Sequence, residues 1–162
     1  RDAQESRGLG DVYKRQIVPV EMKRCVVKLD RKKAEKKAER WQTIALGAAK
    51  QSKRMQIPTV HMPVTFQQAL AMMAESDVRL MPYENAEGME GTRRILESIE
   101  PGESIAILIG PEGGIDEAEV EMAMKEKVEP ITLGKRILRT ETAGMTVLSI
   151  LVYLLEGRER TR

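Results

Sequence analysis

The stretch 105–146 constrains the fold most, because two short apolar runs in it each end at a glycine and one helix joins them. Residues 105–109 have the length and composition of a buried strand, which the glycine-rich sequence 110–114 interrupts. Residues 116–119 carry the Asp-x-x-Glu pattern of a capped helix start, and residues 131–134 predict a second strand that ends at a glycine. This order predicts two parallel strands whose carboxyl ends lie side by side, the edge at which open α/β sheets bind ligands.

The glycines alone leave several interpretations open. The sequence Gly-Pro-Glu-Gly-Gly at 110–114 could be an ordinary tight turn between a strand and a helix. Its backbone N–H groups could instead face a ligand, because glycine has no Cβ in the way. Neither the dinucleotide pattern G-x-G-x-x-G nor the P-loop pattern G-x-x-x-x-G-K-[ST] is present. A phosphate cradle in an unrelated α/β enzyme is therefore a further alternative, and not the favoured one.

The rest of the chain predicts more strands and helices. Strands are expected at 17–20, 26–29 and 78–83, a strand or turn at 58–63, and helices at 31–52, 65–76 and 94–99. On the long helix, the 3, 4 spacing of one buried face is followed by Trp41, Ile44, Ala45, Ala48 and Ala49. A last helix begins at Ala143, and its apolar residues predict burial on more than one side, with Gly157 as the C-cap.

Composition places the chain among soluble globular proteins. Its 162 residues allow one domain with a core, and 41% apolar and 32% charged residues fit that class. No apolar run has the length of a membrane span, and no signal-peptide pattern is present. The single cysteine, Cys25, cannot form an internal disulfide, which fits a cytoplasmic protein. The single histidine, His61, is interpreted as structural, and no metal site is predicted.

The formal net charge of +2 hides a division between two segments. Residues 22–54 contain twelve Lys or Arg and three Asp or Glu, an excess of nine positive charges. Residues 75–129 contain five Lys or Arg and fifteen Asp or Glu, an excess of ten negative charges. The basic segment predicts contact with a polyanion, and a solvated helix face is the alternative.

Several motifs together resemble one family. They are Ile-Gly-Pro-Glu-Gly-Gly at 109–114, Leu-Gly-Lys-Arg-Ile-Leu-Arg-Thr-Glu-Thr-Ala at 133–143, Val-Pro-Val at 18–20, Lys-Arg-Cys-Val-Val-Lys at 23–28 and W-x-x-I-A-x-x-A-x-x-Q-S-x-R at 41–54. These sequences resemble the RsmE-type ribosomal RNA methyltransferases of the SPOUT superfamily, and the resemblance runs from about residue 17 to residue 156.

The resemblance implies a parallel-sheet α/β domain with a C-terminal trefoil knot that binds S-adenosylmethionine. It implies methylation of N3 of a uridine in small-subunit (16S) ribosomal RNA, either as free RNA or in the assembled subunit, by a homodimer. The domain is expected at 17–162, and residues 1–16 are interpreted as an artefactual or disordered leader. Members of this family carry a PUA-like RNA-binding domain and a first catalytic helix before that point, and both are expected to be absent here. A fragment that binds donor and RNA without catalysis is the alternative.

Positions that match the family's motifs give the expected site residues. The donor set comprises apolar residues around the adenosine, glycines that offer backbone groups, and their neighbours: Leu108, Ile109, Leu133, Ile137, Leu138, Gly110, Gly114, Gly134, Pro111, Glu112 and Thr142. The RNA set is Arg24, Gln51, Ser52 and Arg54 from these motifs, together with Lys32 from the basic first turns of the long helix. Gln51 and Ser52 could instead simply end a helix.

Two further positions are the catalytic candidates. The resemblance places Arg139 between donor and substrate, where a guanidinium can stabilise negative charge on the uracil ring. Glu141 and Glu112 are the candidate bases, and each could instead cap a helix or hold the arginine.

Overall fold

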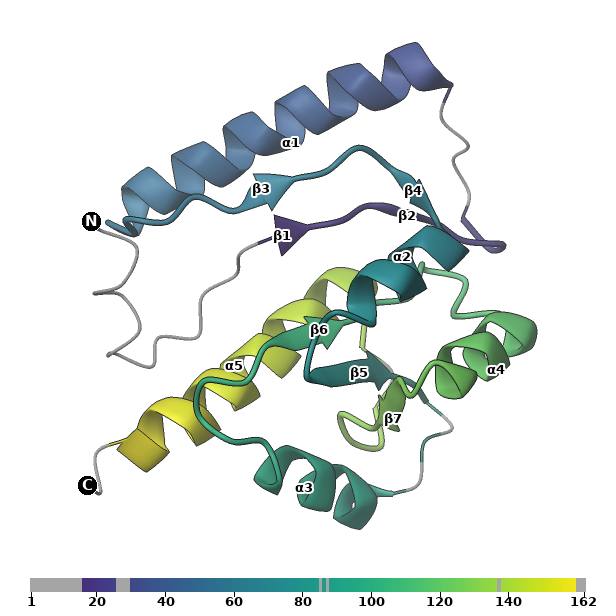
Figure 1. The fold of residues 1–162 in the computed structure, drawn as a ribbon, viewed down its shortest axis with the longest axis vertical. Helices are drawn as coiled ribbons and strands as arrows, with labels where there is room; N and C mark the ends of the chain where they lie inside the picture. The colour runs from purple at the N-terminus through teal and green to yellow at the C-terminus, as the bar shows by residue number, and fades with distance from the viewer. Residues whose placement is uncertain (1–15, 26–29, 85, 87, 137, 160–162) are drawn as a thin grey trace.

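The computed structural model describes residues 16–25, 30–84, 86, 88–136 and 138–159, and of residues 157–159 only the backbone. Most of the expected leader and the expected strand 26–29 lie outside these residues. The described chain folds into two parts that lie against each other (Figure 1). One part holds a three-stranded sheet with helices on both faces, and the other holds the basic helix and two short strand pairs.

The central sheet has the strand order β6-β5-β7, and both pairings are parallel. Its strands are β5 (Val78–Pro82), β6 (Ile105–Ile107) and β7 (Glu129–Ile131). The prediction of a parallel α/β sheet is confirmed, and the ends of β6 and β7 lie at one edge. The expectation that these two lie side by side is wrong, because β5 runs between them. Its Leu80 and Met81 are fully buried on opposite faces of the sheet, as a central strand requires.

Two core clusters lie on the two faces of this sheet. Met81 packs with residues of α2 (Phe66–Met73) and α4 (Glu117–Lys125). Leu80 packs with residues of α3 (Met89–Glu97) and α5 (Thr140–Glu159). The helices therefore cover both faces of the sheet and leave the edge with the strand ends to be formed by loops (Figure 1).

The N-terminal part consists of two parallel strand pairs and one long helix. Strand β1 (Gln16–Ile17) pairs with β3 (Thr59–Val60), and β2 (Val20–Glu21) pairs with β4 (Val64–Thr65). The expected continuous strand 17–20 is wrong, because Pro19 has no N–H for a ladder and the pairing stops there. The Pro19 carbonyl still accepts from the Val64 N–H at 3.0 Å, which holds the two pairs in line.

Helix α1 (Arg31–Gln51) crosses the outside of these strands (Figure 1). Asp30 accepts from the Lys33 N–H as its N-cap, and Ser52 is its C-cap, so the predicted bounds are confirmed. The predicted buried face is only partly right. The buried side chains are Ala34, Ala38, Ala45 and Ala49, which let the helix approach β3 closely. Ile44 is 57% exposed because it lies beside this stripe of alanines and not on it.

The bounds of three other elements differ from expectation, and β7 ends at Ile131, where the expected strand 131–134 only begins. Helix α3 begins at Met89 and not at residue 94, and α5 begins at Thr140 and runs past Gly157. Strand β7 includes Pro130, which an edge strand tolerates because one side of it needs no ladder donor. Within the described residues, none of the helices is both long enough and apolar enough to cross a membrane.

The predicted burial of α5 on more than one side is found in part: the half-buried Ile150 and Leu154 also pack against the core, but another side is exposed in the single chain. Val147, Leu151 and Leu155 form one buried stripe against the sheet. On another side of the helix, Met145 is 62% exposed and Tyr153 is 81% exposed. One side of an apolar helix is therefore uncovered in the single chain.

Candidate functional site

The carboxyl ends of all three central strands meet at one edge of the sheet. Pairing continues just past the strand ends, because the Leu108 N–H donates to Leu80 O at 2.8 Å and the Tyr83 N–H donates to Ile131 O at 2.9 Å. Two loops leave the sheet here, which we call the first glycine loop (residues 108–114) and the second glycine loop (residues 132–139). Most of the predicted donor residues lie in these loops, so the structure brings them to one edge.

In the first glycine loop, the glycines have local structural reasons. A Cβ on Gly110 would lie 2.6 Å from Cγ1 of the buried Ile115, so only glycine fits without a shift. Gly114 has a φ of +72°, and its N–H donates to Pro111 O at 2.9 Å. The interpretation of this loop as a tight turn therefore explains its glycines. It does not exclude a ligand at the same place.

Gly134 in the second glycine loop differs from the glycines of the first loop in what surrounds it. It has a φ of +113°, and a Cβ built on it would meet no atom of the described residues within 4 Å. The Thr132 hydroxyl accepts from the Gly134 N–H and donates to the Gly134 carbonyl, both at 3.3 Å. The glycine is thus required by its backbone conformation, and it faces open space where a ligand can approach.

The predicted apolar residues divide between the edge and the core. Ile109, Leu133 and Leu138 are half-buried in the two loops. Leu108 is only 4% exposed and packs in the core cluster with Met81, so its side chain supports the loop from beneath. Ile137 lies outside the described residues.

The start of α5 connects the two loops. A Cβ on Gly144 would lie 3.8 Å from Cγ1 of Ile109, so the first turns of α5 pack on the first glycine loop. Thr142, a predicted donor residue, lies in the first turn of α5, and its carbonyl accepts from the Thr146 hydroxyl at 2.8 Å. Half-buried Pro111 and exposed Glu112 complete the predicted set on the other side.

The two catalytic candidates lie at the N-terminus of α5. The Arg139 carbonyl accepts from the Ala143 N–H at 2.8 Å, which makes Arg139 the residue that precedes the first helical turn. Glu141 follows in that turn, where a negative charge is favourable. Both side chains are exposed, and within the described part of the chain neither forms an ion pair. Across the same residues, no group of three His, Cys, Asp or Glu is placed to hold a metal ion.

Sequence reasoning missed a set of contacts between the turn 22–25 and the first glycine loop. Lys23 Nζ lies 3.0 Å from Asp116 Oδ1, and Arg24 Nη2 lies 3.6 Å from Asp116 Oδ2. Arg24 Nη1 donates to the Gly113 carbonyl at 3.2 Å, and the Lys23 N–H donates to buried Glu119 Oε1 at 2.8 Å. The hydrogen bond from Lys23 lowers the pKa of Asp116 below its ordinary value of 3.8. The capping box 116–119 was predicted and is confirmed, but no local pattern indicates partners 93 residues away.

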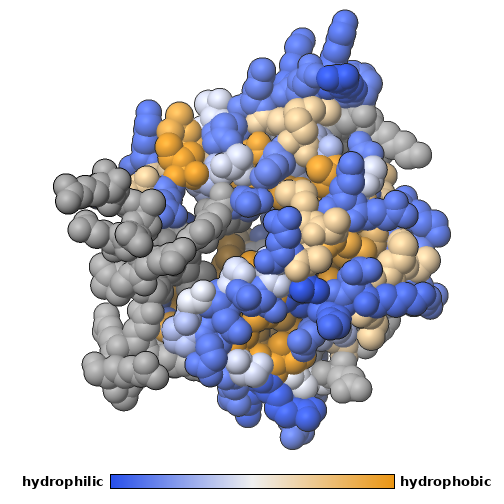
Figure 2. Space-filling view, viewed as in Figure 1, coloured by the Kyte–Doolittle hydropathy of each residue, from blue (hydrophilic) through white to orange (hydrophobic). Residues whose placement is uncertain are grey.

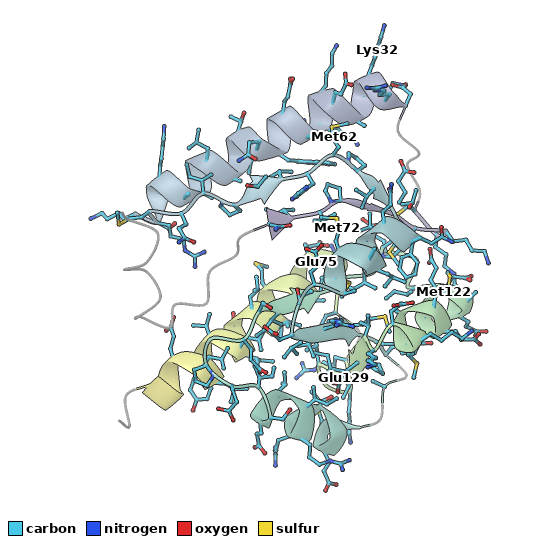
Figure 3. The ribbon with its side chains drawn as sticks, viewed as in Figure 1. Lys32, Met62, Met72, Glu75, Met122 and Glu129 are labelled. Atoms are coloured by element: carbon cyan, nitrogen blue, oxygen red, sulfur yellow. The ribbon has the colours of Figure 1, made fainter. Side chains whose placement is uncertain are left out.

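The predicted RNA residues are not gathered in one place. Lys32 is exposed near the start of α1 and points away from the rest of the molecule (Figure 3). Gln51, Ser52 and Arg54 lie at the other end, roughly 30 Å away at 1.5 Å per residue. The Ser52 hydroxyl donates to Ala48 O at 2.8 Å, which supports the capping alternative for Ser52. Figure 2 shows hydrophilic side chains gathered over the outer side of α1.

A separate groove of about 530 Å³ lies between α1 and the segment 17–19. Apolar side chains line most of it, including Trp41 and Ile44, and Ser52 and Arg54 lie at its border. None of the predicted donor residues that the structure describes lines it. The groove is therefore distinct from the edge that holds the two glycine loops.

Comparisons with known proteins agree with the geometry of the edge. A family model described as an RNA methyltransferase domain matches residues 13–152. The chain is 43% identical over 143 residues to the ribosomal RNA small subunit methyltransferase E of Bacillus subtilis (strain 168), covering 86% of this chain and 56% of that protein. The chain spans about half the length of the curated relatives it matches.

Two solved structures are similar in fold and sequence. A ribosomal RNA small subunit methyltransferase E from Neisseria gonorrhoeae bound to S-adenosyl methionine gives a TM-score of 0.74 at 35% identity, over 86% of this chain and 55% of that chain. A methyltransferase from Legionella pneumophila in complex with the same cofactor gives a TM-score of 0.75 at 34% identity, over 85% of this chain and 54% of that chain.

Proposed function

Since the chain belongs to the RNA methyltransferase domain family, and within it to the ribosomal RNA small subunit methyltransferase E type, we propose that it transfers a methyl group from S-adenosylmethionine to small-subunit ribosomal RNA. One observation in the structure carries this proposal: both glycine loops lie at the carboxyl edge of one parallel sheet, the edge at which α/β folds bind nucleotide-like ligands.

The residues at this edge fit the proposed donor. Gly134 opens onto free space, and the half-buried Ile109, Leu133 and Leu138 offer apolar surface for an adenine ring. Backbone groups of the two loops offer polar partners. In the resembled family this segment forms a trefoil knot around the donor, and we propose the same path for residues 105–159.

S-adenosylmethionine supplies a methyl group that is already electrophilic. The chain therefore contributes by aligning donor and acceptor and by stabilising charge on the acceptor. Alignment of two reactants can lower a barrier by roughly 7–11 kcal/mol. Arg139 projects from the end of the second glycine loop and stays charged at any working pH. We assign to it the stabilisation of negative charge on the acceptor base.

The acceptor we propose is N3 of a uridine, as the resemblance to the family implies. That nitrogen carries a proton that must be removed, and a carboxylate within reach can accept it. Glu141 lies in the first turn of α5 and Glu112 in the first glycine loop, so both border the same edge. Of the two, we propose Glu141 as the base, with Glu112 as the alternative.

The basic N-terminal part is the proposed RNA contact. Its excess of nine positive charges lies in residues 22–54, and the cations of α1 lie in its first turns, up to Arg40, and again at its end, at Lys50. This distribution suits a long polyanion more than a small ligand. A second copy of the chain is the proposed partner for the uncovered side of α5 at Met145 and Tyr153, and the RNA substrate implies a cytoplasmic location.

Two measurements on the purified chain test the proposal. Calorimetry should detect S-adenosylmethionine binding, and donor with a labelled methyl group should transfer label to small-subunit ribosomal RNA. No donor binding at all would contradict the proposal. Donor binding without transfer would favour the alternative, a donor- and RNA-binding fragment.

A further inference from the structure

Two polar or charged side chains are buried among the described residues, and each lies behind one of the two glycine loops. Glu119 accepts from the backbone N–H groups of Lys23 and of Asp116, two residues after the first loop. Thr92 is 4% exposed in the first turns of α3, and its Oγ1 accepts from the Thr132 N–H at 2.8 Å. Thr132 is the first residue after β7, so this bond is made where the second glycine loop begins.

The geometry of an edge strand explains why this bond exists. The Ile131 carbonyl points toward β5, because it accepts from the Tyr83 N–H. In a trans peptide the carbonyl and the next N–H point in opposite directions, so the Thr132 N–H points away from the sheet. Since β7 is an edge strand, no neighbouring strand can receive that donor. Thr92 on α3 receives it instead, across a sequence distance of 40 residues.

From Thr132 the hydrogen bonds continue into the loop. The Thr132 hydroxyl bonds both the N–H and the carbonyl of Gly134, the residue whose φ of +113° turns the chain at the open space. The backbone of Gly134 is therefore linked through Thr132 to a buried hydroxyl on a helix that takes no part in the proposed donor site. A hydroxyl in an apolar core is unfavourable unless it is bonded, so the bond is built into the packing of α3.

We propose that Thr92 is a positioning residue for S-adenosylmethionine binding, which it supports by holding Thr132 and thereby Gly134 in the donor-ready conformation. This inference rests on the proposed function, because it assumes that the second glycine loop holds the donor. It also predicts how the second glycine loop behaves when no donor is present.

The test compares three variants with the parent chain. Thr92→Val keeps the shape but removes the acceptor, Thr92→Ser keeps the hydroxyl, and Ile99→Val loosens the same core cluster from the other end of α3. Calorimetry with S-adenosylmethionine is run at a temperature at which circular dichroism shows all four proteins folded. We expect Thr92→Val to weaken donor binding at least fivefold, with Thr92→Ser and Ile99→Val within twofold of the parent.

Amide hydrogen exchange of the donor-free proteins separates this inference from the proposed function. Thr92→Val should raise exchange at Thr132 and Gly134 and leave residues 113–114 unchanged, whether or not the chain binds the donor. Unchanged exchange at Thr132 and Gly134 would overturn the inference. So would equal losses of donor affinity in Thr92→Val and Ile99→Val, because the hydroxyl would then contribute only to general stability.

Discussion

The two parts of the molecule use their sequence motifs in different ways. In the C-terminal part, predicted site residues from separate motifs converge, because parallel strands β6 and β7 end at the same edge. In the N-terminal part, the predicted RNA residues are spread over the 21 residues of α1 and its flanks. Convergence suits one small ligand, and a spread of positive charge suits a long polyanion. How far apart the predicted residues lie thus indicates which kind of partner each part binds.

The two parts meet in the core, where Met22 packs with Met81, and also beside the first glycine loop. Lys23 and Arg24, from the basic part, hold Asp116 and Gly113 beside the first glycine loop. Arg24 was predicted to contact RNA, and in this structure it contacts the loop that the donor is proposed to approach. Substitutions in each part and at this junction test whether donor binding depends on the C-terminal part and RNA binding on the N-terminal part.

The largest expected effect is at Gly134. A valine there would meet a φ of +113°, which costs a β-branched residue roughly 1–3 kcal/mol, and its side chain would enter the space assigned to the donor. We expect Gly134→Val to weaken donor binding at least a hundredfold, or about 2.8 kcal/mol, by calorimetry.

Gly102 supplies a matched control, since it has a φ of +94° and open space around its Cβ but lies in the turn before β6. Gly102→Val should lose similar stability and keep its donor affinity. If both variants lose donor affinity equally, backbone strain explains the loss in Gly134→Val, and the position of Gly134 in the donor site does not.

The next effect is at Arg139, which should act in catalysis and not in donor binding. We expect Arg139→Ala and Arg139→Lys both to lower the single-turnover methylation rate at least tenfold, or about 1.4 kcal/mol of barrier. Lysine should not restore the rate, because it lacks the planar fork of the guanidinium. Donor affinity should stay within twofold. Full activity of Arg139→Lys would argue against charge stabilisation by this residue, and loss of donor binding would assign it to the pocket.

A smaller effect is expected in the basic part. Lys36→Ala combined with Arg54→Ala should weaken RNA binding severalfold and lower the salt slope by roughly 0.7–0.9 for each phosphate that the variant no longer neutralises. Lys125→Ala, an exposed lysine on α4 in the acidic segment, is the control and should leave the slope unchanged. Donor affinity should be unaffected by all three substitutions. A slope equal to the parent's would support the alternative that the charged face of α1 is only solvated.

The smallest effect is expected at the junction. The pKa of Asp116 is lowered in the folded chain, so this carboxylate stabilises the fold above its ordinary pKa of 3.8 and loses that contribution as the pH falls through its folded value. Asp116→Asn should therefore lower the Tm slightly at pH 7, and the difference from the parent should shrink as the pH falls below 3.8 and vanish below the folded pKa of Asp116. A difference in Tm that persists unchanged at low pH would show that the Lys23 contact is not the cause.

Sequence reasoning predicted the capped start of α4 and both ends of α1, because each depends on residues close together in the chain. It extended the strand before the second glycine loop to residue 134, whereas β7 ends at Ile131. It did not predict that β5 separates β6 and β7, since strand order depends on packing that no single motif records. Ile44 was expected to be buried and is not, because small alanines and not large side chains bring α1 onto β3. The bonds from Lys23 to Asp116 and from Thr132 to Thr92 were missed for the same reason, as their partners are 93 and 40 residues apart.

The central claim is that the carboxyl edge of the three-stranded sheet, and not α1 or its groove, binds S-adenosylmethionine. Backbone amide chemical shifts of the isotopically labelled chain, recorded during a titration with the donor, test it most directly. The largest shifts should fall at residues 109–114 and 132–139, with residues 31–51 unchanged. Shifts centred on Trp41, Ile44 and the rest of the groove, or none at saturating donor concentrations, would contradict the claim.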